Sequence, residues 1–257
     1  MPEATPVLPI VPVQGIEFTR AILGHNPFLG YSYFSEALSQ RYEQQFGEVA
    51  AIEAVIRAAL EAGVRGMMLS FGGPRPELIV SALERACEAV GVQIPTIAIL
   101  DGDFEQHRDL ARRANTKVAV LHGQVTDALY RKRTGDFAPE FDAYLARFRD
   151  FGLLPGASTH NAGETVPAMA GHDVVVVNTP VNKVGWRMCP CPEDMLHALD
   201  RADLTVIGMK PLAMGRLPPA EAMEYALHRP EVDIVLAGAA SPEEAKETFG
   251  AAARVLG

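Results

Sequence analysis

Three of the seven histidines in the chain follow short apolar runs, at places where strands are expected to end. His122 closes the run Val118-Ala-Val-Leu121, and His25 and His160 follow two further runs. An imidazole donates or accepts a proton near neutral pH, so histidines at strand ends are candidates for acid/base chemistry. His122 is the sharpest candidate, and a neutral ring bonded to a backbone carbonyl is the alternative.

Lys210 ends another apolar run and supplies the only amine among these positions. It can polarise a carbonyl, form a Schiff base or hold a phosphate, and the alternative is a long side chain that reaches solvent. Other polar residues at expected strand ends can also cap helices or bond loop carbonyls. They are Asn26, Ser70, Asp101, Asp103, Gln124, Ser158, Thr159, Asn161, Asn178, Thr179, Asn182 and Ser241.

The cysteines predict neither a metal site nor a disulfide framework. Cys189 and Cys191 are too closely spaced for a structural zinc site or an iron-sulfur cluster, and no second pair exists elsewhere. Three cysteines, and a beginning without the order of a secretory signal, predict a reducing cytoplasm. One apolar pocket wall is expected from Phe28, Tyr31, Phe34 and Trp186.

Composition limits the partners. The net charge of −9 provides no basic stripe for a phosphate backbone or an anionic membrane. No apolar run approaches the roughly 20 residues that cross a bilayer. The sequence therefore predicts a small-molecule substrate, with no nucleic-acid or membrane partner.

The elements that would position these side chains alternate between strands and helices. Eight β-branched apolar runs predict strands at Ala21 to Gly24, Gly66 to Leu69, Thr96 to Leu100, Val118 to Leu121, Leu154 to Ala157, Val174 to Asn178, Thr205 to Met209 and Ile234 to Ala237. Amphipathic segments predict helices at Glu48 to Ala62, Pro76 to Val90, Asp103 to Ala114, Glu140 to Phe151, Glu193 to Ala202, Ala220 to Leu227 and Pro242 to Leu256.

A closed eight-stranded parallel β/α barrel is favoured over an open doubly wound sheet. No strand leads into a G-x-G-x-x-G turn, and eight units with a final helix suit ring closure. The length of 257 residues fits one barrel domain spanning residues 1–257. Within residues 1–20, two short runs flank Gln14-Gly15 and predict a hairpin that plugs the barrel.

Several motifs resemble those of the aldo-keto reductase superfamily, over nearly the whole chain. Val206 to Leu217 resembles its seventh-strand segment, closest to the branch that often carries an iron-sulfur tail, although the tail is absent. Gly156-Ala-Ser158 resembles the fifth-strand G-x-S motif, Asn178 to Asn182 the sixth-strand segment, and Val235 to Glu247 the last-strand turn and helix. The resemblance implies a nicotinamide dinucleotide that lies across the barrel mouth and reduces a carbonyl.

Most of the family's catalytic residues are missing. His122 matches the family histidine at the end of strand four. Ser70 and Phe71 stand where the family has its aspartate and tyrosine, and the neighbourhood of Leu100 and Asp101 replaces its lysine. A phenyl ring cannot donate a proton, so the family mechanism is not expected unchanged. The candidate catalytic residues are His122, His25, Asp101, His160 and Lys210.

The resemblance also assigns cofactor positions. Ser158 and Asn178 match residues that bind the carboxamide, and Thr159 replaces a family asparagine. Glu244 stands where many members place an arginine on the adenosine 2′-phosphate, so NAD is expected in preference to NADP. The full set is Ser158, Thr159, Asn178, Lys210, Leu212, Gly238, Ser241 and Glu244.

Three functions remain open. The first is a diverged aldo-keto-reductase-like oxidoreductase that acts on a small carbonyl or alcohol with a nicotinamide cofactor. The second is a lyase, isomerase or hydrolase that uses Lys210 or a divalent metal held by some of the mouth residues His25, Asp101, His122 and His160. The third is a ligand-binding barrel without catalysis.

Overall fold

The computed structural model describes residues 8–100 and 105–257, and within them eight parallel strands close into a barrel in the order β10-β11-β12-β3-β4-β5-β6-β9. The predicted fold class is confirmed. Three strands begin and end at the predicted residues, and the ends of the others shift by one or two residues. The strands are β3 (Ala21–Gly24), β4 (Met67–Ser70), β5 (Thr96–Leu100), β6 (Thr116–Leu121), β9 (Leu154–Ser158), β10 (Val176–Pro180), β11 (Thr205–Met209) and β12 (Ile234–Gly238).

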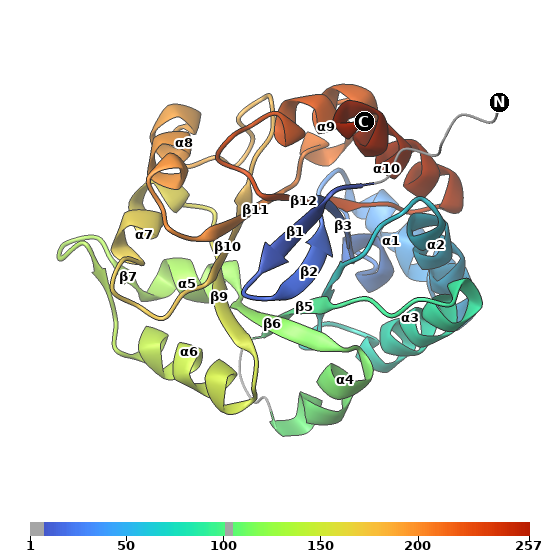
Figure 1. The fold of residues 1–257 in the computed structure, drawn as a ribbon, viewed down its shortest axis with the longest axis horizontal. Coiled ribbons are helices and arrows are strands. Elements are labelled where there is room, and N and C mark those ends of the chain that lie inside the picture. The colour runs from blue at the N-terminus through green and yellow to red at the C-terminus, as the bar shows by residue number, and fades with distance from the viewer. Residues whose placement is uncertain (1–7, 101–104) are drawn as a thin grey trace.

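Helices form a ring around the barrel (Figure 1). The clearest predicted helix, α2, buries Ile52, Val55, Ile56 and Ala59 on the stripe that its 3.6-residue period defines. The helices are α1 (Glu36–Gln45), α2 (Val49–Glu61), α3 (Pro76–Val90), α4 (Arg108–Arg113), α5 (Gly123–Leu129), α6 (Glu140–Asp150), α7 (Ala162–Ala168), α8 (Pro192–Asp200), α9 (Pro219–Leu227) and α10 (Pro242–Leu256).

Three helices lie where no helix is predicted. Helix α1 buries none of its residues, so its sequence has no apolar stripe to reveal it. Helices α5 and α7 have seven residues each, which is too short for a periodic pattern. The helix predicted from Asp103 starts outside the described residues, and its described part is a 3-10 turn at Glu105–His107 followed by α4.

The predicted N-terminal hairpin is present. Strands β1 (Ile10–Val13) and β2 (Ile16–Thr19) pair antiparallel, and Gln14 and Gly15 both have positive φ angles, as a two-residue hairpin turn requires. In Figure 1 the hairpin lies across the barrel opening that faces the viewer. Val13 and Phe18 are buried against the side chains that fill the barrel, so this end is closed and a ligand must enter from the opposite end.

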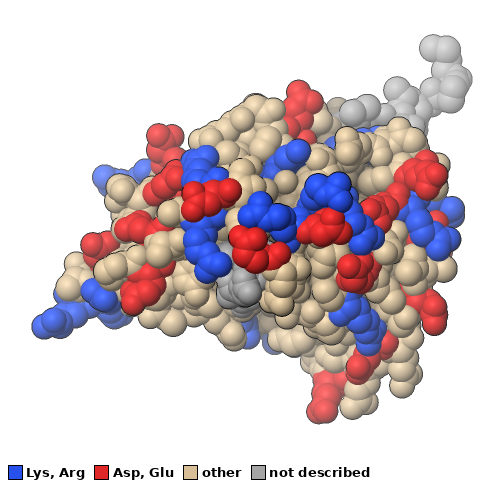
Figure 2. All heavy atoms as spheres, turned by 90° about the horizontal axis from the view of Figure 1, so that it is seen from below, with Lys and Arg blue, Asp and Glu red and all other residues tan. Residues whose placement is uncertain are grey.

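Charges of both signs are mixed on the side of the molecule seen in Figure 2. Many of the charged side chains are paired: Arg113 bonds Glu77 and Glu84, and Arg149 bonds Asp173. No helix among the described residues has both the length and the apolar character needed to cross a bilayer.

Candidate functional site

A cavity of about 940 Å³ opens at the carboxyl ends of the barrel strands. This is the end at which barrels of this kind place their chemistry. Its walls come from residues at or just after several strands, including His25, Ser70, His122, Ser158, Asn178 and Lys210. Many of the residues chosen from the sequence at strand ends therefore meet around one cavity, whereas others do not line it: Thr159, Asn161, Thr179, Asn182 and Ser241.

Three residues of this cavity wall each have a buried polar atom with no hydrogen-bond partner. Among the described residues, the buried side-chain nitrogen and oxygen atoms without a partner are Nδ1 of His25, Nε2 of His160 and Oδ1 of Asn178. Leaving a buried polar atom unpaired costs about 1–3 kcal/mol. Their shared location favours a ligand with polar groups that complete these bonds.

His25 is an uncharged acceptor. Its pKa is lowered to about 4, chiefly by burial and less by repulsion from Lys210 and His122, while a hydrogen bond to the Met68 backbone opposes the shift. Because Nδ1 has no partner, Nε2 makes the bond to Met68, and Nδ1 of the neutral ring carries a free lone pair. A ligand with an O–H or N–H group would supply the hydrogen-bond donor that this lone pair lacks.

His122 has its proton on the other nitrogen. Its Nδ1 accepts a hydrogen bond of 3.3 Å from the backbone N–H of Gln124 and so caps helix α5. The bond needs a lone pair on Nδ1, which places the proton on Nε2. His122 thus reaches the cavity as a hydrogen-bond donor, suited to polarising a carbonyl oxygen.

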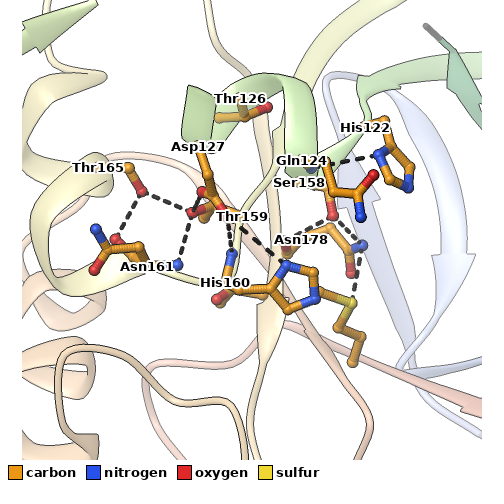
Figure 3. A network of polar contacts seen from close by, with 12 residues as sticks. His122, Gln124, Thr126, Asp127, Ser158, Thr159, His160, Asn161, Thr165 and Asn178 are labelled. Atoms are coloured by element: carbon orange, nitrogen blue, oxygen red, sulfur yellow. Dashed lines mark hydrogen bonds and ion pairs between the residues drawn. The ribbon is translucent and has the colours of Figure 1, made fainter. Parts of the chain in front are cut away.

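His160 is held by a carboxylate that sequence reasoning missed. Figure 3 shows Asp127 of helix α5 between His160 and Thr159. Its Oδ2 accepts from the backbone N–H of His160 at 3.2 Å and lies 3.8 Å from Nδ1 of the ring. Its Oδ1 accepts from the hydroxyl of Thr159 at 2.6 Å. Asp127 belongs to a short helix, so no sequence period indicated its direction.

Thr159 does not line the cavity. Its hydroxyl is fully buried and bonds Asp127 and Thr165, and it also accepts from the backbone N–H of Asn161 (Figure 3). The structure therefore places Thr159 behind the cavity wall, where it holds Asp127. The residue that follows it, His160, faces the cavity instead.

Ser158 and Asn178 form a buried pair. Nδ2 of Asn178 donates to Oγ of Ser158 at 2.9 Å, and Oγ of Ser158 donates to the backbone carbonyl of Asn178 at 3.2 Å. These bonds fix the orientation of the amide, because its nitrogen is already used. Oδ1 is left as a buried acceptor without a hydrogen-bond partner.

Lys210 lies in the cavity with no counter-ion among the described residues. Among the described residues no carboxylate lies within ion-pair distance of its Nζ, which is 3.1 Å from Sδ of Met209. Burial, with a smaller contribution from the neighbouring charge of Arg187, lowers its pKa to about 7. The amine is therefore partly unprotonated at neutral pH. The Lys210 backbone has a φ of 62°, a conformation that non-glycine residues seldom adopt.

Aromatic side chains form one wall of the cavity. Tyr31, Phe34 and Trp186 line it as predicted, whereas Phe28 is buried against Phe46 and does not. Tyr33, which the sequence reasoning did not single out, packs edge-on against both Tyr31 and Trp186. Burial raises the pKa of Tyr33, so its hydroxyl stays protonated.

The remaining predicted residues fall into three groups. Leu212, Gly238 and Glu244 line the cavity, and Oε2 of Glu244 accepts from the backbone N–H of Ala240 at 2.8 Å. Ser241 does not line it and instead caps helix α10 through the N–H of Glu244. Asp101 lies outside the described residues. Within residues 8–100 and 105–257, no three His, Cys, Asp or Glu side chains are gathered as a metal site would need.

Comparisons with known proteins identify the fold. No protein-family profile and no curated protein matches the sequence. Solved structures do match. A Pseudomonas aeruginosa protein assigned to the aldo-keto reductases superposes with a TM-score of 0.68 at 14% identity, over 99% of both chains. An aldo-keto reductase from Bacillus halodurans in its holo form gives 0.64 at 14% identity, over 95% of this chain and 90% of its own.

The aldose reductase from Schistosoma japonicum gives a TM-score of 0.61 at 15% identity, over 91% of this chain and 83% of its own. The similarities extend over nearly the whole chain. They define this molecule as a barrel with the aldo-keto reductase fold, as the sequence motifs predict.

Proposed function

We propose that the protein is an oxidoreductase that acts on a small carbonyl or alcohol with a nicotinamide dinucleotide bound across the cavity. The observation that carries this is Oδ1 of Asn178, a buried acceptor without a partner. Ser158 accepts from the amide nitrogen and so fixes the amide of Asn178, a residue of the cavity wall. A nicotinamide carboxamide has the N–H donors that this oxygen needs, so the residues fit the group.

When bound, a reduced nicotinamide supplies a hydride to the substrate carbon. The protein's own residues then orient the substrate oxygen and stabilise the charge that develops on it. His122 presents Nε2–H, and Tyr33 carries a protonated hydroxyl in the same cavity wall. Phe71, which resembles the family tyrosine by position, is buried and has no proton to give.

NADH fits better than NADPH. Glu244 lines the cavity, and its carboxylate is tied to the Ala240 backbone at the start of α10. A carboxylate at this place repels the additional phosphate of NADPH, whereas the hydroxyl of NADH carries no charge.

The test is a fluorescence titration of the purified protein with NADH and NADPH, followed by Trp186 quenching. Saturable binding with NADH preferred is expected. Asn178→Leu should weaken NADH binding roughly three- to tenfold, the value of one hydrogen bond, and Lys246→Ala on the exposed face of α10 is the matched control. No binding of either nucleotide at millimolar concentration would overturn the proposal.

A second function is favoured by Lys210, a buried amine with no described counter-ion. Its nitrogen can form a bond to the carbon of an aldehyde or ketone, after which the oxygen leaves as water and an imine remains. Borohydride reduction followed by peptide mass analysis would show the substrate on Lys210. Lys210→Met is the control, and a failure to trap any carbonyl compound on wild-type Lys210 would rule out this chemistry.

A further inference from the structure

The three cavity histidines have different partners and so different chemical capacities. Protonation of Nδ1 of His122 would break the bond from Gln124 that caps helix α5. A second proton on His25 would create a charge in a buried site beside Lys210. Among the described residues, His160 is the one of the three with a carboxylate near its ring, since Oδ2 of Asp127 lies 3.8 Å from its Nδ1. The geometry around His160 is therefore the one that suits proton transfer.

Helix α5 both makes room for His160 and supplies its carboxylate. Gly123 is the first residue of the helix, and a Cβ there would lie 3.2 Å from Nδ1 of His160 and 3.3 Å from its Cε1. Asp127 lies one turn further along. Its carboxylate is fixed by Thr159 and by the backbone N–H of His160, so it cannot turn away from the ring.

The opposite side of the ring meets the cavity. Nε2 of His160 is buried, has no hydrogen-bond partner and belongs to a residue of the cavity wall. A carboxylate beside Nδ1 favours the proton on Nδ1 and leaves the lone pair on Nε2. The reactive nitrogen is thus directed toward the ligand.

We propose that Asp127 and His160 form the proton-transfer pair of the cavity, with Nε2 of His160 exchanging a proton with the substrate oxygen and Asp127 as its positioning residue. This proposal rests on the proposed function, because the reduced nicotinamide is the source of the electrons. In the reducing direction the ring starts with a proton on both nitrogens. The N–H bond at Nε2 breaks, its electron pair stays on the nitrogen, and the Nδ1–H remains beside Asp127. A bond forms between that proton and the carbonyl oxygen, while the carbonyl carbon receives its hydrogen and electron pair from the reduced nicotinamide.

The pair can be tested without substrate or cofactor. Nitrogen-15 NMR of histidine-labelled protein distinguishes a ring protonated at Nδ1 from one protonated at Nε2. Neutral His160 should carry its proton on Nδ1, and Asp127→Asn should shift the population toward Nε2. His122 should stay protonated at Nε2 in both proteins, because its partner is a backbone N–H. Neutral His160 protonated mainly at Nε2 in the wild-type protein would overturn the proposal even if the variant does not fold.

Activity measurements then test the transfer itself. His160→Gln should lower turnover roughly 100- to 10,000-fold, the range for a lost acid/base group, with little change in the Kd for NADH. Asp127→Asn should lower kcat by about 10- to 100-fold. If the wild-type protein binds no NADH but His160 has the expected tautomer, the proposed oxidoreductase function is contradicted and the Asp127–His160 pair is supported. If the His160→Gln variant reduces carbonyls as well as the wild type does, the pair alone is contradicted.

Discussion

Nζ of Lys210 lies 4.9 Å from the centre of the Tyr33 ring. The face of an aromatic ring stabilises an ammonium by about 0.5–2 kcal/mol. Burial opposes this stabilisation of the charged amine and brings the pKa of Lys210 to about 7. Tyr33 therefore substitutes only in part for the carboxylate that a buried lysine usually has.

We expect Lys210 to react with an amine reagent such as acetic anhydride at neutral pH. The labelling rate, followed by peptide mass analysis, should rise with pH and level off above about 7, where the amine has lost its proton. Lys117, which is exposed on β6, controls for reagent quality. An inflection near the ordinary lysine value of about 10.4 would show that Lys210 is not desolvated.

Acid should destabilise the protein through His25. The folded-state pKa is about 4 and the ordinary value is 6.5, so below pH 6.5 the unfolded chain takes up a proton that the folded chain refuses. The free energy of unfolding falls as the pH drops from 6.5 to about 4, by about 3 kcal/mol in total. Below this range the folded ring is protonated as well and the loss stops growing.

Urea unfolding measured across this pH range for the wild type and for His25→Gln tests the prediction. The variant cannot take up a proton at this position, so its stability should fall less steeply. Identical pH dependence in the two proteins would mean that His25 is protonated as readily in the folded chain as in the unfolded one.

Glu244 should determine the choice of coenzyme. Glu244→Gln removes the negative charge and should improve NADPH binding about fivefold relative to NADH, which corresponds to about 1 kcal/mol. Glu243→Gln, one residue earlier and outside the cavity wall, removes the same charge and is the control. If the two variants bind NADPH equally, only the overall charge of the region matters and the specific role of Glu244 is excluded.

The sequence predicted the barrel because its strands are apolar on both faces and are separated by amphipathic helices. The same reasoning placed His25, His122 and His160 at strand ends, and all three line the cavity. It could not distinguish their roles, because the tautomer of each ring depends on a neighbour such as Met68, Gln124 or Asp127.

Side-chain direction was the missing information. Thr159 and His160 are adjacent in the sequence, and resemblance to a family asparagine favoured Thr159 as the cofactor contact. In the structure Thr159 turns to Asp127 and Thr165, and His160 lines the cavity. Asp127 itself was not predicted, since a carboxylate on a seven-residue helix looks like any solvated surface residue.

Gly156 of the G-x-S motif is required by strand packing. A Cβ at this position would lie 2.6 Å from the backbone oxygen of Val176 and 2.9 Å from Cγ1 of Val120. Val176 and Val120 are its register partners on the two neighbouring strands, β10 and β6, so neither can move without disturbing the barrel. The motif therefore needs glycine because there is no space for a side chain. The close approach of β9 to β10 at Gly156 also keeps Ser158, two residues further along β9, near Asn178.

Gly156→Ala should lower the free energy of unfolding by about 1–3 kcal/mol, the usual cost of overpacking a core. Gly250→Ala is the matched control, because its Cβ would meet only the flexible end of Arg254 at 3.5 Å, inside helix α10. There alanine should raise stability by about 0.5–1 kcal/mol, since glycine is a poor helix former. If strand packing requires the motif glycine, urea denaturation should show changes of opposite sign in the free energy of unfolding of the two variants. A neutral Gly156→Ala would show that β9 can move away from β10, and the motif glycine would then need a functional explanation at the cavity.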